Sequence, residues 1–173
     1  MDFESLRATT LEFVRTHEAW APFITGGLAF CESVAVLSLL VPATVILVGI
    51  GALLGATGLE FWPIWLGAAL GAALGDWLCY EVGRYFDESV KHMWPLNKQP
   101  DLVRRAEDFI QRFGAWGIFL GRFFGPARAL VPLIAGVFDM PRVPFQAANV
   151  ASAMIWAFVL LAPGAGLTQF LTG

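Results

Sequence analysis

Residues 121–136 have the sequence GRFFGPARALVPLIAG, an apolar stretch that contains two arginines and two prolines. A straight α-helix would place Arg122 and Arg128 roughly 240° apart, because each residue turns the helix by about 100°. Pro126 and Pro132 remove backbone donors and clash with the preceding turn, so they disfavour such a helix. We therefore predict a broken helix or a re-entrant hairpin with its tip near these prolines.

The two arginines make insertion of this stretch into a bilayer costly. One arginine at the bilayer centre costs about 2.5–3.5 kcal/mol, so two cost roughly 5–7 kcal/mol. Non-helical backbone at that depth also requires burial in protein or a wet cavity. We interpret Arg122 and Arg128 as an anion-handling site; the alternative is that both side chains snorkel to the membrane interface.

The composition places the chain in the membrane class. Of the 173 residues, 57% are hydrophobic and 14% are charged, whereas about 25% of the residues of a soluble domain are charged. The sequence has no basic stripe, so we expect no nucleic-acid partner. Cys31 and Cys79 lie in apolar stretches without a CxxC motif or a neighbouring histidine. We interpret them as small buried hydrophobic residues, and we expect no metal and no cofactor.

The N-terminal third combines a polar segment with a long apolar run. Residues 1–18 have apolar side chains at approximate helical spacing among charged ones, which predicts an amphipathic helix on the membrane surface; a disordered leader is the alternative. Residues 19–56 are apolar and divided by Pro42. The run is nearly long enough for two crossings of about 20 residues each. A hairpin of two half-length helices explains it as well as two spans do.

Residues 61–83 are predicted to form a transmembrane helix. Glycine recurs at every fourth position on one face, which allows close approach of another helix: Gly67, Gly71 and Gly75. The aromatic residues near the two ends resemble interfacial anchors: Trp62 and Trp65, then Tyr80 and Tyr85. Asp76 is either a functional acid or a residue that caps or bridges near the membrane surface.

Residues 84–113 form a polar loop followed by an amphipathic helix that begins at Pro100-Asp101. Six of the eleven basic residues lie in this segment, so the positive-inside rule assigns it to the cytoplasm.

The arginine hairpin is expected over residues 115–138, and a final transmembrane span over 143–171, interrupted by Pro163-Gly164. Asn149 and Trp156 are seven residues apart and therefore share one face of that span. For Asn149 we expect a hydrogen bond to another helix.

A matched spacing relates the two predicted hairpins. Glu32 lies ten residues before Pro42, and Arg122 lies ten residues before Pro132. Inverted repeats with broken helices occur in many transporters. The predicted fold is an all-α integral membrane protein, with two re-entrant helical hairpins in inverted repeat plus transmembrane helices and amphipathic surface helices. In this arrangement Glu32 and the arginines approach the membrane midplane from opposite faces.

Three blocks of the sequence resemble the DedA family of VTT-domain membrane proteins. The arginine stretch, with the downstream residues Asn149 and Trp156, resembles the family's main motif. The segment GAALGDWLCYEVGR at 71–84 resembles a second block, and Glu32 with Pro42 resembles the first. The similarity spans roughly residues 20–165, and residues 19–173 are expected to form a single domain of this type.

The resemblance implies a transporter and not an enzyme. The family is associated with moving lipids across bilayers, including undecaprenyl phosphate and phospholipids, and several members are linked to the proton-motive force. It implies that Arg122 and Arg128 are the family's paired arginines and that Glu32 is its membrane acid. We therefore expect Arg122 and Arg128 to bind substrate and Glu32, with Asp76, to serve proton coupling or gating. We expect six further residues to support the site: Thr44, Pro42, Pro126, Pro132, Asn149 and Trp156.

One position departs from the family pattern. Many members have a second acid after the first proline, but the residue twelve positions after Glu32 is Thr44. This change puts a two-acid proton relay in doubt. The segments around Trp94-Pro95 and Pro163-Gly164 look closest to family members fused to lipid-phosphatase domains, which favours a lipid phosphate as cargo.

The resulting hypothesis is a multi-pass protein of the bacterial cytoplasmic (inner) membrane that flips or scrambles a lipid phosphate or a phospholipid. Alternatives are a small-anion or proton-coupled drug transporter and a structural protein with a static Glu–Arg pair. An intramembrane enzyme is disfavoured, because His17 and His92 lie in polar flanks and no Ser/His/Asp or HExxH pattern is present. The sequence leaves a homo-oligomer open.

Overall fold

The computed structural model describes residues 18–34, 43–86, 100–124, 128 and 130–166. These residues form helices and turns and include no β-strand. The helices in chain order are η1 (Glu18–Trp20), α2 (Ala21–Ser33), α3 (Ala43–Thr57), α4 (Phe61–Phe86), α6 (Pro100–Phe113), α7 (Ala115–Gly121), α8 (Leu130–Val137) and α9 (Arg142–Ala165). The predicted all-α class is therefore confirmed for the described residues.

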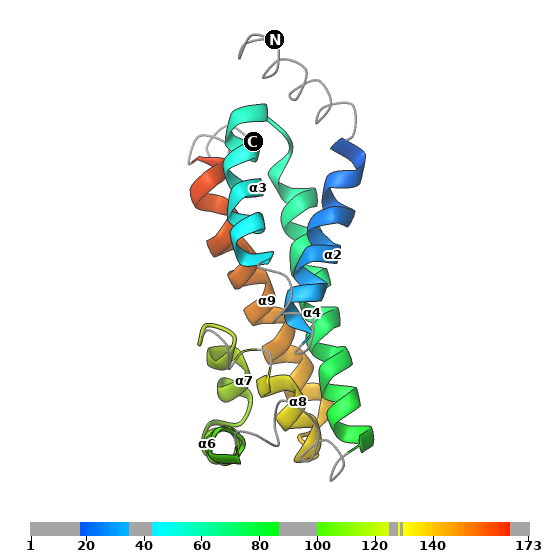
Figure 1. Ribbon diagram of the computed structural model, residues 1–173, viewed down its shortest axis with the longest axis vertical. Helices are drawn as coiled ribbons and strands as arrows, with labels where there is room; N and C mark the ends of the chain where they lie inside the picture. The colour runs from blue at the N-terminus through cyan, green and yellow to red at the C-terminus, as the bar shows by residue number, and fades with distance from the viewer. Residues whose placement is uncertain (1–17, 35–42, 87–99, 125–127, 129, 167–173) are drawn as a thin grey trace.

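Two long helices form the axis of the molecule, and shorter helices cover its two halves (Figure 1). Helices α4 and α9 extend along most of the length and pack against each other. Helices α2 and α3 lie in the upper half, where α2 packs on α4 and α3 packs on α9. Helices α7 and α8 lie in the lower half, where α7 packs on α9 and α8 packs on α4. Helix α6 lies across the lower end.

Proline occurs in the first turn of several helices and does not break them. Pro22, Pro63, Pro132 and Pro144 are the second or third residues of α2, α4, α8 and α9. The first backbone N–H groups of a helix have no partner within it, so proline removes nothing there. The sequence predicted a hairpin tip near Pro126 and Pro132. Pro126 lies outside the described residues, and Pro132 lies in the first turn of α8, where it is fully buried.

The last helix also differs from its prediction. Helix α9 continues through Pro163-Gly164 and ends at Ala165, so the expected interruption at these two residues is wrong. Pro163 lies in the last turn, where the chain is about to leave the helix and little helix remains to be broken. Gly166 follows with a φ of 78°, a left-handed conformation that favours glycine at a helix end.

Among the described helices, α9 is the one long and apolar enough to cross a membrane by length and composition. Helix α4 is longer, and the acids Asp76 and Glu81 interrupt its apolar sequence.

Two apolar clusters fill the interior, one in each half of the molecule. The upper cluster contains Ala73 of α4 and Ala153 of α9, together with residues of α2 and α3. The lower cluster contains Cys79 of α4 and Phe145 of α9, together with residues of α6, α7 and α8. A short polar layer separates the two clusters on both long helices. It holds Asp76 on α4, and Asn149 and Ser152 on α9, all of which are buried.

Glycine allows the helices of the upper half to approach closely, as the spacing on α4 predicted. A Cβ atom on Gly71 would lie 2.0 Å from the backbone oxygen of Gly26 on α2. A Cβ atom on Gly67 would lie 2.2 Å from the backbone oxygen of Pro22. Helices α2 and α4 are therefore in backbone contact, and a larger side chain at either glycine would push the two helices apart.

We expect Gly71→Ala to lower the free energy of unfolding by about 1–3 kcal/mol or more, the usual cost of overpacking. The measurement is unfolding of the detergent-solubilised chain by titration with SDS. Gly27→Ala on α2 is the matched control, since nothing lies within 4 Å of its added Cβ atom. Equal stability of the two variants would contradict the close packing of α2 on α4.

The outer surface is rich in apolar side chains along the long helices. Helix α4 exposes Leu66, Leu70, Leu74, Trp77 and Leu78, and α9 exposes Val150, Met154, Ile155, Phe158 and Val159. Soluble proteins rarely present such a continuous apolar surface, whereas it suits contact with lipid. Of the predicted aromatic anchors, Trp62 and Tyr85 are exposed, but Tyr80 is fully buried. Its hydroxyl donates a hydrogen bond to the Met140 carbonyl, so its assignment as an interfacial anchor is wrong.

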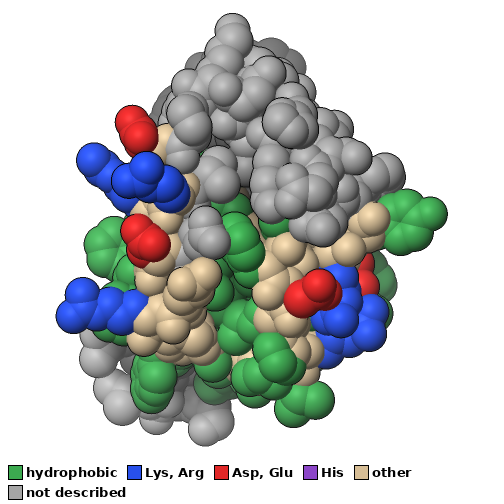
Figure 2. All heavy atoms as spheres, turned by 90° about the horizontal axis from the view of Figure 1, so that it is seen from below, with side chains coloured by type: hydrophobic (Ala, Val, Ile, Leu, Met, Phe, Trp, Pro, Cys, Tyr) green, Lys and Arg blue, Asp and Glu red, His purple; other side chains and the backbone are tan. Residues whose placement is uncertain are grey.

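Charged side chains gather at the lower end. Figure 2 shows them at two places on the rim of that end, with hydrophobic side chains between. One group belongs to α6, whose Arg104, Arg105 and Arg112 are exposed while Ile110 is buried, as expected for an amphipathic helix. The other joins α4 to the start of α9, where Arg142 Nε lies 3.0 Å from Glu81 Oε1.

The predicted N-terminal amphipathic helix falls almost entirely outside the described residues, as do Pro42 and Pro126.

Candidate functional site

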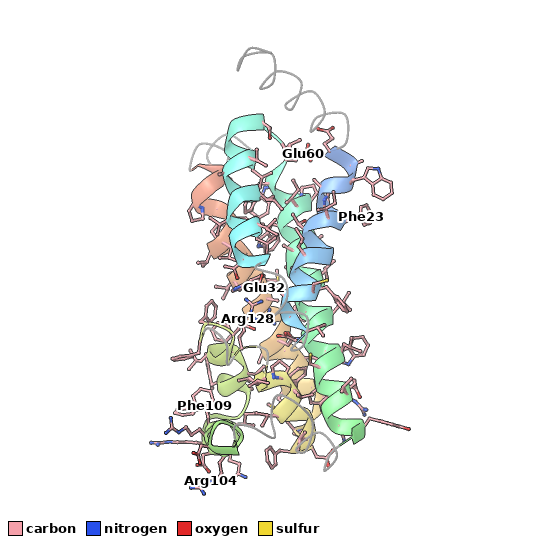
Figure 3. The ribbon with its side chains drawn as sticks, viewed as in Figure 1. Phe23, Glu32, Glu60, Arg104, Phe109 and Arg128 are labelled. Carbon is pink, nitrogen blue, oxygen red and sulfur yellow. The ribbon has the colours of Figure 1, made fainter. Side chains whose placement is uncertain are left out.

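The polar layer between the two apolar clusters contains the charged residues that the sequence singled out. Glu32 lies near the end of α2, and Arg128 lies just before α8. Figure 3 shows that their side chains face each other midway along the molecule, where the upper and the lower helices meet. Asp76 and Arg122 lie in the same layer, since both are buried and paired with each other.

Arg122 follows the last residue of α7 and is enclosed by polar groups from the two long helices. Its Nη2 forms an ion pair with Asp76 Oδ2 of α4 and donates a hydrogen bond to Asn149 Oδ1 at 2.6 Å. Its Nε donates to Ser152 Oγ at 3.0 Å. Only 4% of the Arg122 side chain and 9% of the Asp76 side chain are exposed. This guanidinium is therefore tied to α4 and α9 at the same time.

The partners of Arg122 are themselves held in place. Asn149 Nδ2 donates to the Ala73 carbonyl of α4 at 2.9 Å, which directs its amide oxygen at Arg122. Ser152 Oγ donates to the Asn149 carbonyl one turn earlier, leaving its lone pairs to accept from Arg122. The expected hydrogen bond between Asn149 and another helix is thus confirmed.

Arg128 and Glu32 form a second buried ion pair of a different kind. Arg128 Nη2 lies 3.2 Å from Glu32 Oε1, and 12% and 8% of the two side chains are exposed. The Thr44 hydroxyl of α3 donates a hydrogen bond to the same oxygen, Oε1. Within the described part of the chain, neither Glu32 Oε2 nor Arg128 Nη2 makes a hydrogen bond. This pair is close, but it leaves hydrogen-bonding capacity unused.

Trp156 supports Arg128 from the side of α9. The guanidinium carbon lies 4.6 Å from the centre of the Trp156 ring. The face of an indole attracts a cation, and a guanidinium that stacks on it keeps the N–H groups at its edge free for other acceptors. The sequence placed Trp156 on the same face as Asn149, and the structure brings both to the polar layer, each beside a different arginine.

The structure brings together most of the predicted site residues in two ion pairs. Glu32 pairs with Arg128, and Arg122 pairs with Asp76. Asp76 is a buried partner of Arg122 inside the molecule. Thr44 donates a hydrogen bond to Glu32.

Sequence reasoning missed Ser152. It lies three residues after Asn149 and four before Trp156, so helical spacing on that face was the signal that could have found it.

Within the described residues, no group of three or more His, Cys, Asp or Glu side chains is placed to hold a metal ion. Cys31 and Cys79 form no disulfide, and Cys79 is buried in the lower apolar cluster.

Comparison of the sequence with known proteins assigns the chain to a family. Residues 41–166, well over half of the chain, match the VTT domain. The chain belongs to the VTT-domain (DedA) family. The matched residues contain Asp76, both arginines, Asn149 and Trp156, and they exclude Glu32.

Several VTT-domain relatives are membrane proteins by name. The inner membrane protein YabI of Escherichia coli K12 is 36% identical over 137 residues, which cover 79% of this chain and 54% of YabI. The uncharacterized membrane protein BU139 of Buchnera aphidicola subsp. Acyrthosiphon pisum is 30% identical over 152 residues, covering 88% of this chain and 59% of BU139. The uncharacterized membrane protein Rv2637 of Mycobacterium tuberculosis is 32% identical over 140 residues, covering 78% and 63%.

The chain therefore spans between about half and two thirds of the length of these relatives. No solved structure matches it. The relatives place the chain in a membrane family, and none of the comparisons points to an enzyme.

Proposed function

We propose that this chain moves the phosphate head group of a lipid across the bacterial cytoplasmic membrane. The observation that carries the proposal is the pair of buried arginine–carboxylate contacts midway along an apolar helical bundle. Holding guanidinium groups at that depth is costly. A substrate anion that crosses the membrane at the same depth would explain why the arginines are kept there despite this cost.

We propose that α4 and α9 cross the membrane and that the other apolar helices form two re-entrant hairpins. Helices α2 and α3 would enter from one face, and α7 and α8 from the other, as their places in the two halves of the molecule suggest. The packing supports an inverted repeat, because α2 on α4 corresponds to α7 on α9, and α3 on α9 corresponds to α8 on α4. The basic residues of the lower end favour the cytoplasmic side for that end.

The chemistry suits a phosphate ester. A guanidinium binds phosphate through charge-assisted hydrogen bonds, and two of them form at once when the planes match. The apolar tail of the lipid would stay in the bilayer along the exposed leucines and aromatic residues while the head group passes the polar layer. Undecaprenyl phosphate and phospholipids both have such a head group and tail.

Glu32 is proposed as the residue that competes with the substrate. It would pair with arginine when the site is empty and give way when phosphate arrives. With Thr44 in place of a second acid on α3, the carboxylates of the described polar layer that could serve proton coupling are Glu32 and Asp76. A small free oxyanion has the same head-group chemistry and is the second candidate; the exposed apolar surface beside the site favours the lipid.

The test is translocation by the full chain reconstituted in liposomes. We expect a fluorescent polyprenyl phosphate or phosphatidic acid to cross faster than in empty liposomes. Uptake of free inorganic phosphate in a parallel assay separates the second candidate. The variant Glu32→Gln with Arg128→Gln is the inactive control, because it removes one buried charge of each sign. Lipid and phosphate movement no faster than in empty liposomes would overturn the proposal.

A further inference from the structure

We propose that the two arginines have separate tasks: Arg128 exchanges its partner Glu32 for the anion, whereas Arg122 stays bound to Asp76 and does not contact the anion. The inference deepens the proposed function and rests on it. The two ion pairs differ in how many of their donors and acceptors make hydrogen bonds. We base the two tasks on this difference.

The contacts of Arg122 hold its guanidinium in its site. Its charge is balanced by Asp76, and Asn149 and Ser152 accept two further hydrogen bonds from it. An anion that bound Arg122 would have to displace a carboxylate and break bonds to two helices. Each lost bond would leave a buried polar group unsatisfied, which is unfavourable. We assign Arg122 the task of joining the end of α7 to α4 and α9.

Arg128 is placed for exchange. It contacts one carboxylate oxygen, which it shares with the Thr44 hydroxyl. Its Nη2 lies 3.2 Å from Glu32 Oε1 as an ion pair but makes no hydrogen bond, and the buried Glu32 Oε2 makes none within the described residues. An unsatisfied buried donor beside an unsatisfied buried acceptor is rare in folded proteins and calls for an explanation such as a missing ligand. A phosphate oxygen would satisfy the donor.

The surroundings of Arg128 permit that exchange. Trp156 holds one face of the guanidinium at 4.6 Å and so can keep the group in place when Glu32 leaves. The Thr44 hydroxyl stays with Glu32 and can accompany the released carboxylate. The exposed position of Thr44 places the pair next to the surface of the molecule.

The exchange has an unusual consequence for Glu32. If this carboxylate occupies the place of the anion, then neutralising it removes a competitor. Glu32→Gln should therefore bind phosphate more tightly than the unmodified chain and yet translocate lipid more slowly, because nothing expels the bound anion. A residue with a purely structural task would not separate binding from transport in this way.

The experiment uses the full chain in nanodiscs of a zwitterionic phospholipid and isothermal titration calorimetry with two probes, inorganic phosphate and dihexanoyl phosphatidic acid. We expect Glu32→Gln to raise the affinity for both head groups by about tenfold, which corresponds to about 1.4 kcal/mol. Lipid translocation in liposomes should fall in the same variant. Preference for phosphatidic acid over inorganic phosphate identifies the lipid as the source of the anion.

Two double variants provide the matched comparison, since each removes one buried ion pair and leaves the net charge unchanged. Arg122→Gln with Asp76→Asn should keep the affinity of the folded protein within about threefold, while Arg128→Gln with Glu32→Gln should lower it by at least about thirtyfold. If the Arg122 variant does not fold, Ser152→Ala replaces it, since it removes one acceptor of Arg122; it should lower the melting temperature and leave the affinity unchanged.

Two results would overturn the inference: an affinity of Glu32→Gln equal to or below that of the unmodified chain, or equal losses in the two double variants. Both differ from failure of the proposed function, in which the unmodified chain binds neither probe and moves no lipid.

Discussion

Replacement of Arg122 by methionine is expected to lower the free energy of unfolding by about 3–5 kcal/mol, because it leaves the Asp76 carboxylate buried without its cation. Asn149 and Ser152 lose a donor in the same step. The loss is a large fraction of the stability of a typical domain, about 5–15 kcal/mol. SDS titration of the purified variant measures it directly.

The control for this prediction removes both charges. Asp76→Leu combined with Arg122→Met replaces the ion pair by apolar side chains of similar size, and such replacements are often neutral or stabilising. We therefore expect the double variant to regain most of the lost stability. If it is as unstable as Arg122→Met alone, the damage does not come from an unpaired Asp76.

The second large effect concerns transport. Arg128→Met is expected to reduce lipid-phosphate translocation by about 100-fold or more, because each hydrogen bond to a charged group contributes about 1.5–3 kcal/mol and a phosphate would lose up to two of them. Stability should fall less than in Arg122→Met, since Glu32 keeps its bond to Thr44. Initial rates in liposomes at matched protein density measure the effect.

Arg142→Met is the matched control for Arg128→Met. Arg142 also pairs with a glutamate, but 60% of its side chain is exposed and it lies at the end of the molecule. Exposed pairs contribute little to stability. We expect normal translocation in this variant. Equal loss in both variants would indicate a general effect of charge at the membrane surface and would contradict a role specific to Arg128.

The helical class, the close face of α4 and the amphipathic helix α6 could be predicted, because each depends on periodicity along one segment. The fourfold repeat of Gly67, Gly71 and Gly75 determines which face can touch a neighbour whatever that neighbour is. The start of α8 could not be predicted from proline alone. Proline is excluded from the middle of a helix and tolerated in its first turn, and only the start of α8 tells which case applies to Pro132.

The charged residues of the candidate site could be predicted from the sequence. Which carboxylate pairs with which arginine could not. Charge inside an apolar stretch identified Glu32, Asp76, Arg122 and Arg128. Which carboxylate meets which arginine depends on how four helices pack, and no spacing within one segment contains that information. Tyr80 illustrates the same limit: its position near a helix end suggested an interfacial anchor, but α8 and α9 cover it.

The location of the polar layer has an electrical consequence. The layer lies where the upper and lower helices meet, midway along the molecule. In the proposed orientation, a head group that reaches Arg128 from either face has crossed about half of the membrane potential. Moving one elementary charge through the whole potential changes its energy by about 2.3 kcal/mol per 100 mV. Crossing half of a 100 mV potential therefore changes the energy of a singly charged head group by roughly 1 kcal/mol. Voltage would therefore favour arrival from one leaflet and departure toward the other by similar amounts.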